Sequence, residues 1–291
     1  MRTLITGASG VLGSALLAEL DDGVSERPVA LDADALDISD GAAVAGFFAR
    51  HAPFELVVNC AAMTDVDACE RLRGELWRTN ALGPLYLAQA CSKSGAKLVQ
   101  ISTDYVFEGL SPGLKAEDHP AGPVNAYGKA KRAAELLVRA ACPRSHVVRT
   151  SRLFSPDAGG FAQSILRTAA RTGKISVVDD QVGNPTYAKD LARAILQIAR
   201  SEDYGVWHAA NAGACSWFAF ARAILETAGI ACEKEPLTSE QYKRRFPASA
   251  DRPRFSGLST DKLAGAGCAM RPWREALADF VEELEKRGEL P

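Results

Sequence analysis

The chain has 291 residues, of which 47% are hydrophobic and 24% are charged, and its formal net charge is -2. No run approaches the ~18 apolar residues that a membrane helix needs, and the balanced charge excludes a global field that would recruit nucleic acid or an anionic membrane. The N-terminus leads directly into a strand-like run and leaves no room for a secretory leader, so we expect a cytoplasmic protein.

Cysteine and histidine usage argues against disulfides and metal ions. The seven cysteines are odd in number, widely scattered and include no Cys-x-x-Cys pair, so we expect reduced thiols. The four histidines do not occur at ligand spacing, and we predict no metal site.

A glycine-rich turn at residues 7–13 lies between a predicted strand at residues 2–6 and a predicted helix at residues 14–20. Such a turn lets the backbone approach a pyrophosphate, which binds the N–H groups and the positive end of the helix. The spacing is Gly-x-x-Gly-x-x-Gly rather than Gly-x-Gly-x-x-Gly, and glycines are also common as simple turn formers. The flanking strand and helix favour dinucleotide binding by Gly7, Ser9, Gly10, Val11, Leu12 and Gly13.

Asp32 ends a second predicted strand, at residues 28–31, about 20 residues after the glycines. A carboxylate there accepts hydrogen bonds from the adenosine ribose hydroxyls, which favours NADH over NADPH. Carboxylates at strand ends also cap helices, and Asp34 and Asp37 compete with Asp32 for the ribose. Asp37 and Ile38 precede a predicted helix at residues 41–51 and are candidates for flanking the adenine.

Two further apolar runs predict strands at residues 55–59 and 97–101. Small residues follow the first of these strands, so Ala61, Ala62 and Met63 permit the close approach of a cofactor. In an open α/β sheet, ligands bind outside the carboxyl ends of the strands. Thr103 and Asp104 therefore fall on the functional edge.

The alternation of strands and helices through residue 150 predicts a Rossmann-like doubly wound parallel sheet. We predict a dinucleotide-binding domain at residues 1–150, completed by about residues 186–210. A smaller, mostly C-terminal α/β substrate domain is predicted at residues 151–185 and 211–291. The predicted elements of the substrate domain are helices at residues 161–172 and 273–286, a strand at residues 175–178, and a loop at residues 181–186 that is too rich in helix- and strand-breaking residues for regular structure. A predicted helix at residues 190–200 and a predicted strand at residues 205–208 belong to the segment that completes the dinucleotide-binding domain.

Tyr127 and Lys131 are four residues apart, so a helix beginning near Asn125 places both side chains on one face. A close ammonium group lowers the pKa of a phenol by stabilising the phenolate, which would make Tyr127 a proton donor usable near neutral pH. A Tyr-x-x-x-Lys match is frequent by chance, so its weight depends on its context.

Several longer motifs occur in order along the chain. With them the sequence resembles the extended short-chain dehydrogenase/reductase superfamily and, within it, the dTDP-4-dehydrorhamnose reductase family, over essentially its whole length. The specific motifs are Ser-Thr-Asp-Tyr-Val-Phe at residues 102–107 and Gln-x-Gly-x-Pro-Thr at residues 181–186. The others are at residues 7–13, 59–62, 127–131 and 149–151, and Arg252-Pro253 followed by Ser256 and Leu258.

The resemblance implies hydride transfer from NADPH or NADH to the C4 ketone of a dTDP-4-keto-6-deoxysugar. Tyr127 would donate a proton to the carbonyl oxygen, Thr103 would orient that oxygen, and Lys131 would hold the nicotinamide ribose. The expected partner is therefore a dTDP-linked nucleotide-sugar substrate. We expect the protein to be a monomer or a homodimer.

The resemblance also implies substrate contacts. Val66, Asp104 and Tyr105 match family positions that line the sugar pocket, although a core or turn position would also explain them. Among the C-terminal arginines, which suit a nucleotide diphosphate, Arg252 matches the family pattern best. Arg244, Arg245 and Arg254 would equally form a solvated face.

Two positions depart from the family. Arg152 stands where the family usually carries an aromatic residue that packs against the sugar, and we predict that it contacts the substrate by stacking or by pairing with a charge. Lys189 aligns with a glutamate that binds Mg²⁺ at a dimer contact in some members, so we predict no metal-dependent dimer.

Two other functions remain open. Relatives of this family include a non-catalytic, cofactor-binding regulatory subunit, although the intact set of Thr103, Tyr127 and Lys131 favours an enzyme. A nucleotide-sugar epimerase or dehydratase would use the same Tyr and Lys with a tightly held oxidised cofactor.

Overall fold

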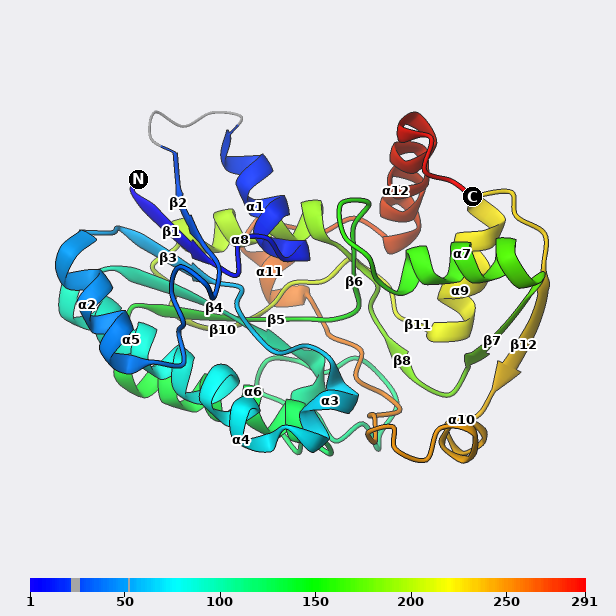
Figure 1. Ribbon diagram of the computed structural model, residues 1–291, viewed down its shortest axis with the longest axis horizontal. Coiled ribbons are helices and arrows are strands. Elements are labelled where there is room, and N and C mark those ends of the chain that lie inside the picture. Colours follow the sequence, from blue (N-terminus) through cyan, green and yellow to red (C-terminus); the bar gives the residue numbers. More distant parts are fainter. Residues whose placement is uncertain (22–26, 52) are drawn as a thin grey trace.

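A six-stranded parallel sheet forms the centre of the larger part of the protein (Figure 1). The computed structural model describes residues 1–21, 27–51 and 53–291. The strand order is β10-β5-β4-β3-β1-β2, so the chain passes from β1 outward to β2 and then returns to β3 on the other side of β1. This reversal is the switch point at which open α/β sheets bind ligands. The strands are β1 (Thr3–Thr6), β2 (Val29–Leu31), β3 (Leu56–Asn59), β4 (Lys97–Thr103), β5 (Ser145–Thr150) and β10 (Gly205–His208).

Helices cover both faces of this sheet, as buried parallel strands require. Leu4 and Ile5 are neighbours in β1 but enter two different cores, because successive side chains of a strand point to opposite faces. α1 and α8 pack on the Ile5 side, and α2, α5 and α6 pack on the Leu4 side (Figure 1). The elements of these layers are α1 (Val11–Asp21), α2 (Gly41–His51), α3 (Val66–Arg71), α4 (Arg73–Trp77), a π-helical turn (Arg78–Leu82), α5 (Gly83–Ser94), a 3-10 turn (Asp104–Val106), α6 (Ala126–Ala141), α8 (Ala188–Arg200) and α11 (Asp261–Gly265).

The smaller part has its own core beside a two-stranded parallel sheet of β7 and β12. Phe154, Phe220 and Phe280 meet in that core, with ring centroids 5.4 to 5.5 Å from Phe154. Short strand pairs, β6 with β9 and β8 with β11, lie between the two parts (Figure 1). The elements are β6 (Leu153–Phe154), α7 (Phe161–Thr172), β7 (Lys174–Val178), β8 (Val182–Gly183), β9 (Thr186–Tyr187), β11 (Cys215–Ser216), α9 (Trp217–Thr227), β12 (Glu233–Leu237), α10 (Ser239–Arg245) and α12 (Trp273–Arg287).

The predicted fold class is confirmed, with two local corrections. β4 extends to Thr103, so this residue lies in the sheet and not in the loop after it. The prediction of an irregular loop at residues 181–186 is wrong, because the segment contains β8 and the first residue of β9. Each pairs with a distant strand, and such pairing depends on tertiary context rather than on local composition. Within the described ranges, no helix is long and apolar enough to cross a membrane.

Candidate active site

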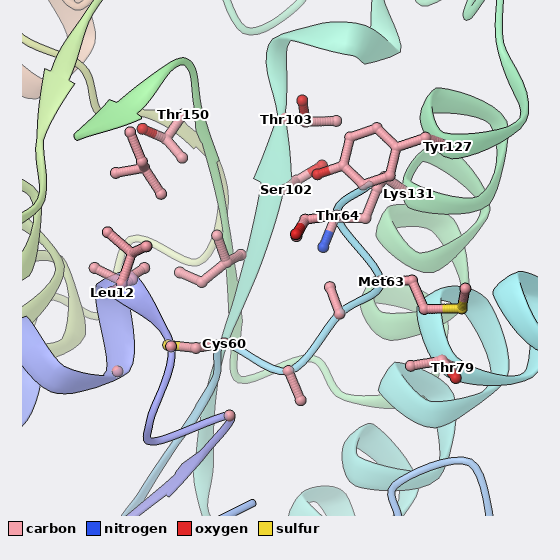
Figure 2. A pocket seen from close by; sticks show the side chains of 18 of the residues that line it. Leu12, Cys60, Met63, Thr64, Thr79, Ser102, Thr103, Tyr127, Lys131 and Thr150 are labelled. Carbon is pink, nitrogen blue, oxygen red and sulfur yellow. The ribbon is translucent and has the colours of Figure 1, made fainter. Parts of the chain in front are cut away.

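A cavity of about 1030 Å³ opens at the carboxyl ends of β1, β3, β4 and β5. Its walls come from the glycine-rich turn, from the segments that follow β2 and β3, from α6 and from the start of α9. Figure 2 shows the segment after β3 at Cys60 and Met63, and α6 with Tyr127 and Lys131. Every residue predicted to bind the cofactor lines this cavity, as do the predicted substrate residues Val66, Thr103, Asp104, Tyr105 and Arg152. The topology therefore brings these residues together, while their individual roles stay predictions.

The glycine-rich turn packs so closely that two of its positions need glycine. Gly7 has φ +67, and a Cβ there would lie 2.6 Å from the backbone nitrogen of Ala61. A Cβ on Gly13 would lie 2.3 Å from the carbonyl oxygen of Gly7. At Gly10 the nearest atom would be 3.3 Å away, so this position has more room. The turn is thus held against the end of β3 and leads into the amino end of α1, where an anion is stabilised.

Asp32 lies beside the glycine-rich turn. Both of its carboxylate oxygens accept the backbone N–H of Ser9, at 3.1 and 3.2 Å. Asp37 accepts the N–H of Ser39 at 2.8 Å, and the next residue, Ile38, is buried. Of the three competing carboxylates, Asp32 and Asp37 line the cavity and Asp34 does not.

Two buried asparagines hold the segment after β3. Asn59 accepts the hydroxyl of Thr6 at 2.7 Å and the N–H of Ala61 at 3.2 Å. Asn80, in the π-helical turn, accepts the N–H of Met63 and donates to its carbonyl, both at 2.8 Å. The backbone of the predicted cofactor contacts is therefore fixed from both sides. Sequence reasoning did not find the role of Asn80, because an isolated Asn in a helical pattern carries no signal for it.

Tyr127 and Lys131 extend from the same face of α6 into the cavity, as predicted (Figure 2). Asn125 caps the helix by accepting the N–H of Gly128 at 2.8 Å, which fixes where the helix begins. A Cβ on Gly128 would lie 2.2 Å from the carbonyl oxygen of Tyr105, so α6 sits directly against the turn after β4. In Figure 2 the ring of Tyr127 reaches across to the strand that carries Ser102 and Thr103.

The predicted pKa of Tyr127 is wrong in direction. Burial, and next the nearby carboxyl of Asp104, raise the pKa of the phenol, and the neighbouring Thr103 hydroxyl opposes this only in part. Burial lowers the pKa of Lys131 to about 8, against the charge of Glu135. The cost of desolvating a phenolate therefore decides the direction of the shift. The consequence is that Tyr127 holds its proton firmly at neutral pH.

A buried ionic network lies below Tyr127 and Lys131. Glu135, one turn after Lys131, accepts the hydroxyl of Ser102 at 2.7 Å and two hydrogen bonds from Arg149 at 2.8 Å. Although burial opposes it, the bonds from Arg149 lower the pKa of Glu135. The network ties α6 to β4 and β5 and so fixes the distance between Tyr127 and Thr103.

Arg152 is engaged by the protein itself. Its backbone has φ +48, unusual for a residue other than glycine. The guanidinium donates to the carbonyl oxygens of Cys215 and Gln181, both at 2.7 Å, and lies 4.1 Å from the ring centroid of Trp217. Arg152 lines the cavity, but its charge is used to hold Trp217, which lines the cavity as well. Trp217 was not predicted, because its sequence context shows only the start of a helix.

Arg252 lines a second cavity, of about 690 Å³, and not the first. Its guanidinium donates to Asp67 at 2.9 Å and to the carbonyl of Ala250 at 2.9 Å. Trp217 lines both cavities and marks their common wall. Arg245 pairs with Glu235 at 3.1 Å, outside either cavity.

No group of three or more described His, Cys, Asp or Glu residues is arranged to hold a metal ion.

Comparison with known proteins gives consistent results. Residues 1–286 match the family described as "RmlD substrate binding domain". A dTDP-4-dehydrorhamnose reductase of Mycolicibacterium smegmatis is 42% identical over 285 residues, which cover 96% of this chain and 85% of that protein. The solved structure of a dTDP-4-dehydrorhamnose reductase from Clostridium acetobutylicum is 37% identical with a TM-score of 0.92, covering 98% of this chain and 100% of that one. The enzyme of the same name from Bacillus anthracis, solved in complex with NADP, is 36% identical with a TM-score of 0.91, covering 97% and 99%.

Proposed function

The chain belongs to the RmlD substrate binding domain family, and from this membership we propose that it reduces the C4 ketone of a dTDP-4-keto-6-deoxysugar. It is a nicotinamide-dependent oxidoreductase of the short-chain dehydrogenase/reductase type. The observation that carries the finer proposal is the convergence of Thr103, Tyr127 and Lys131 on the cavity that the glycine-rich turn lines.

The residues fit a nicotinamide dinucleotide. The narrow turn around Gly7 and Gly13 leaves backbone N–H groups at the amino end of α1 for a pyrophosphate. Asp32 favours the free ribose hydroxyls of NADH, whereas the Bacillus anthracis relative was solved with NADP. We therefore expect both cofactors to bind, with NADH slightly favoured.

A bound reduced nicotinamide supplies the hydride, and the protein supplies the proton and the geometry. Tyr127 carries its proton at neutral pH and donates it to the oxygen on which negative charge develops. Thr103 offers a second hydroxyl to that oxygen. Lys131, buried on the same face of α6, holds the cofactor ribose near Tyr127.

The second cavity suits the nucleotide end of the substrate. Its apolar lining, which includes Ile165 and Val177, can cover a base, and Arg252 at its wall can turn its planar guanidinium toward a diphosphate. The shared wall at Trp217 would then lie near the junction of the sugar and the nucleotide.

The test is turnover of enzymatically prepared dTDP-4-keto-6-deoxysugars with NADH or NADPH, followed at the nicotinamide absorbance. Tyr127→Phe should bind the cofactor and lose about 10²- to 10⁴-fold in kcat. Tyr204→Phe is the matched control, since Tyr204 bonds to Arg144 and Glu202 outside the cavity, and its kcat should be unchanged.

Three results would contradict parts of this proposal. Cofactor binding without turnover of any such sugar would favour the regulatory subunit. Oxidised cofactor retained through purification, with sugar conversion but no net redox change, would favour the epimerase or dehydratase. Full activity of Tyr127→Phe would reject the proton donor.

A further inference from the structure

Asp104 is a buried carboxyl group with no ionic partner in the part of the chain that the structure describes. It is 3% exposed and begins the 3-10 turn after β4. Thr103 Oγ1 lies 3.1 Å from its Oδ1, and the Ser256 hydroxyl donates to its Oδ2 at 2.5 Å. Among the described residues, the carboxyl forms no ion pair. The Ser151 hydroxyl also favours the ionised form, but hydroxyl groups alone compensate a buried charge poorly.

The groups around Asp104 do not supply the missing cation. The charge of Arg152 acts on Asp104, but its guanidinium donates to the backbone carbonyls of Cys215 and Gln181. Tyr105 faces Asp104 from the same turn and Tyr127 from α6, and both are neutral acids at neutral pH. Burial therefore raises the pKa of Asp104, against the hydrogen bond from Ser256 and the charge of Arg152.

The protonation state of Asp104 decides which way the Thr103 hydroxyl points. Thr103 Oγ1 has one hydrogen and two lone pairs, and the N–H of Tyr105 occupies one lone pair at 3.1 Å. A protonated Asp104 donates to the second lone pair, which leaves the Thr103 hydrogen free for the cavity. An ionised Asp104 takes that hydrogen, and only a lone pair then faces the cavity.

We infer that protonated Asp104 is a positioning residue that makes Thr103 a hydrogen-bond donor to the carbonyl oxygen of the ketone. This inference rests on the proposed function. A ketone oxygen accepts only, so it needs the protonated arrangement, while an alcohol can donate to Thr103 when Asp104 is ionised. Asp104 transfers no proton to the substrate, because Tyr127 supplies it.

The protonation of Asp104 can be measured on the protein alone, without any turnover. The infrared difference spectrum between the parent protein and Asp104→Asn should show the carbonyl stretch of a protonated carboxyl at neutral pH. Ser256→Ala removes the donor that stabilises the ionised form, so the pH at which this band disappears should rise by about one unit. Ser256 is buried and lines neither cavity, so this variant acts through Asp104.

Kinetics then test the consequence for the reaction. Asp104→Asn can donate to Thr103 and accept from Ser256, so it imitates the protonated acid. In its pH profile of kcat, the only alkaline decline left should be that of Lys131, whose pKa is about 8. In Ser256→Ala, the decline of kcat that accompanies ionisation of Asp104 should occur at a pH higher by about one unit. Asp104→Leu has the same size without the hydrogen bond and should lose about 10²- to 10³-fold in kcat at every pH.

The outcomes separate this inference from the proposed function. A missing carboxyl band at neutral pH overturns the inference, even if the sugars are reduced. So does an Asp104→Asn variant as inactive as Asp104→Leu, or a Ser256→Ala profile identical to the parent. Absence of turnover in the parent, with the band present, overturns the proposed function and leaves the protonated Asp104 established.

Discussion

Gly13 and Gly10 both belong to the glycine-rich turn, but the structure assigns them different tasks. A Cβ on Gly13 would meet three backbone atoms, the carbonyl oxygens of Gly7 and Ala8 and the Cα of Ala8, at 2.3, 2.6 and 2.7 Å. Backbone atoms cannot swing away as a side chain can, so Gly13→Ala must displace the turn. A Cβ on Gly10 would meet only the carbonyl of Gly7, at 3.3 Å.

We expect Gly13→Ala to lower the free energy of unfolding by about 1–3 kcal/mol, the usual cost of overpacking. With a slope near ~3 kcal/mol per M for urea in a chain of this size, the midpoint should fall by roughly 0.3–1 M. Gly10→Ala should change the free energy of unfolding by less than ~0.5 kcal/mol. It should instead weaken cofactor binding, because its Cβ would enter the space that a pyrophosphate needs.

The assay is urea unfolding followed by tryptophan fluorescence, with cofactor binding titrated separately on each folded variant. An unchanged midpoint for Gly13→Ala would refute the packing argument. Equal losses of stability in the two variants would also refute it, because the distances separate the positions by 1.0 Å, from 2.3 to 3.3 Å.

Three further predictions concern the ionisable side chains of Glu135, His208 and Arg152. Glu135→Gln should lower the free energy of unfolding by about 3–5 kcal/mol at pH 7, because it leaves Arg149 unpaired. Since the folded-state pKa of Glu135 is lowered, the difference in urea unfolding between parent and variant should shrink as the pH falls below the unfolded value of ~4.3. Burial lowers the pKa of His208 to about 3, so between roughly pH 6.5 and 3 acid favours unfolding by up to about 1.4 kcal/mol per pH unit, and His208→Gln should unfold at a lower pH in an acid titration. Arg152→Lys should lower the free energy of unfolding in urea by about 1–3 kcal/mol and raise the KM for the sugar, because a single ammonium cannot reach both carbonyls and cover Trp217. An unchanged KM would contradict the idea that Arg152 supports Trp217.

Much of the fold is predictable because its signals are local. The apolar run of β1 sends Leu4 and Ile5 to opposite cores, as a strand covered on both faces must. Gly7 and Gly13 mark a turn in which a Cβ atom would lie 2.6 and 2.3 Å from the nearest backbone atom. Tyr127 and Lys131 share a face because helical spacing requires it. Each of these conclusions depends on a few neighbouring residues.

The supports of the site depend instead on contacts between distant segments. Ser256 reaches Asp104 across 152 residues of sequence, and Asn80 holds the backbone of Met63 across 17. The direction of the Tyr127 pKa was mispredicted for the same reason, since the spacing to Lys131 does not show the burial that raises the pKa of the phenol. Glu135 was not predicted either, although it lies four residues after Lys131 and helical spacing alone would place it on the same face.

Arg152 departs from the family pattern, and the structure shows what its side chain contacts within the protein. From the sequence, Arg152 in place of an aromatic residue is predicted to contact the substrate by stacking or by pairing with a charge. In the structure the guanidinium is bonded to carbonyls 63 and 29 residues away, and its face covers an indole that lines the cavity. The aromatic surface is therefore present, contributed by Trp217, and Arg152 holds it in place. The residue at position 152 therefore determines how this wall of the cavity is supported. The choice of sugar depends instead on the groups that contact Trp217.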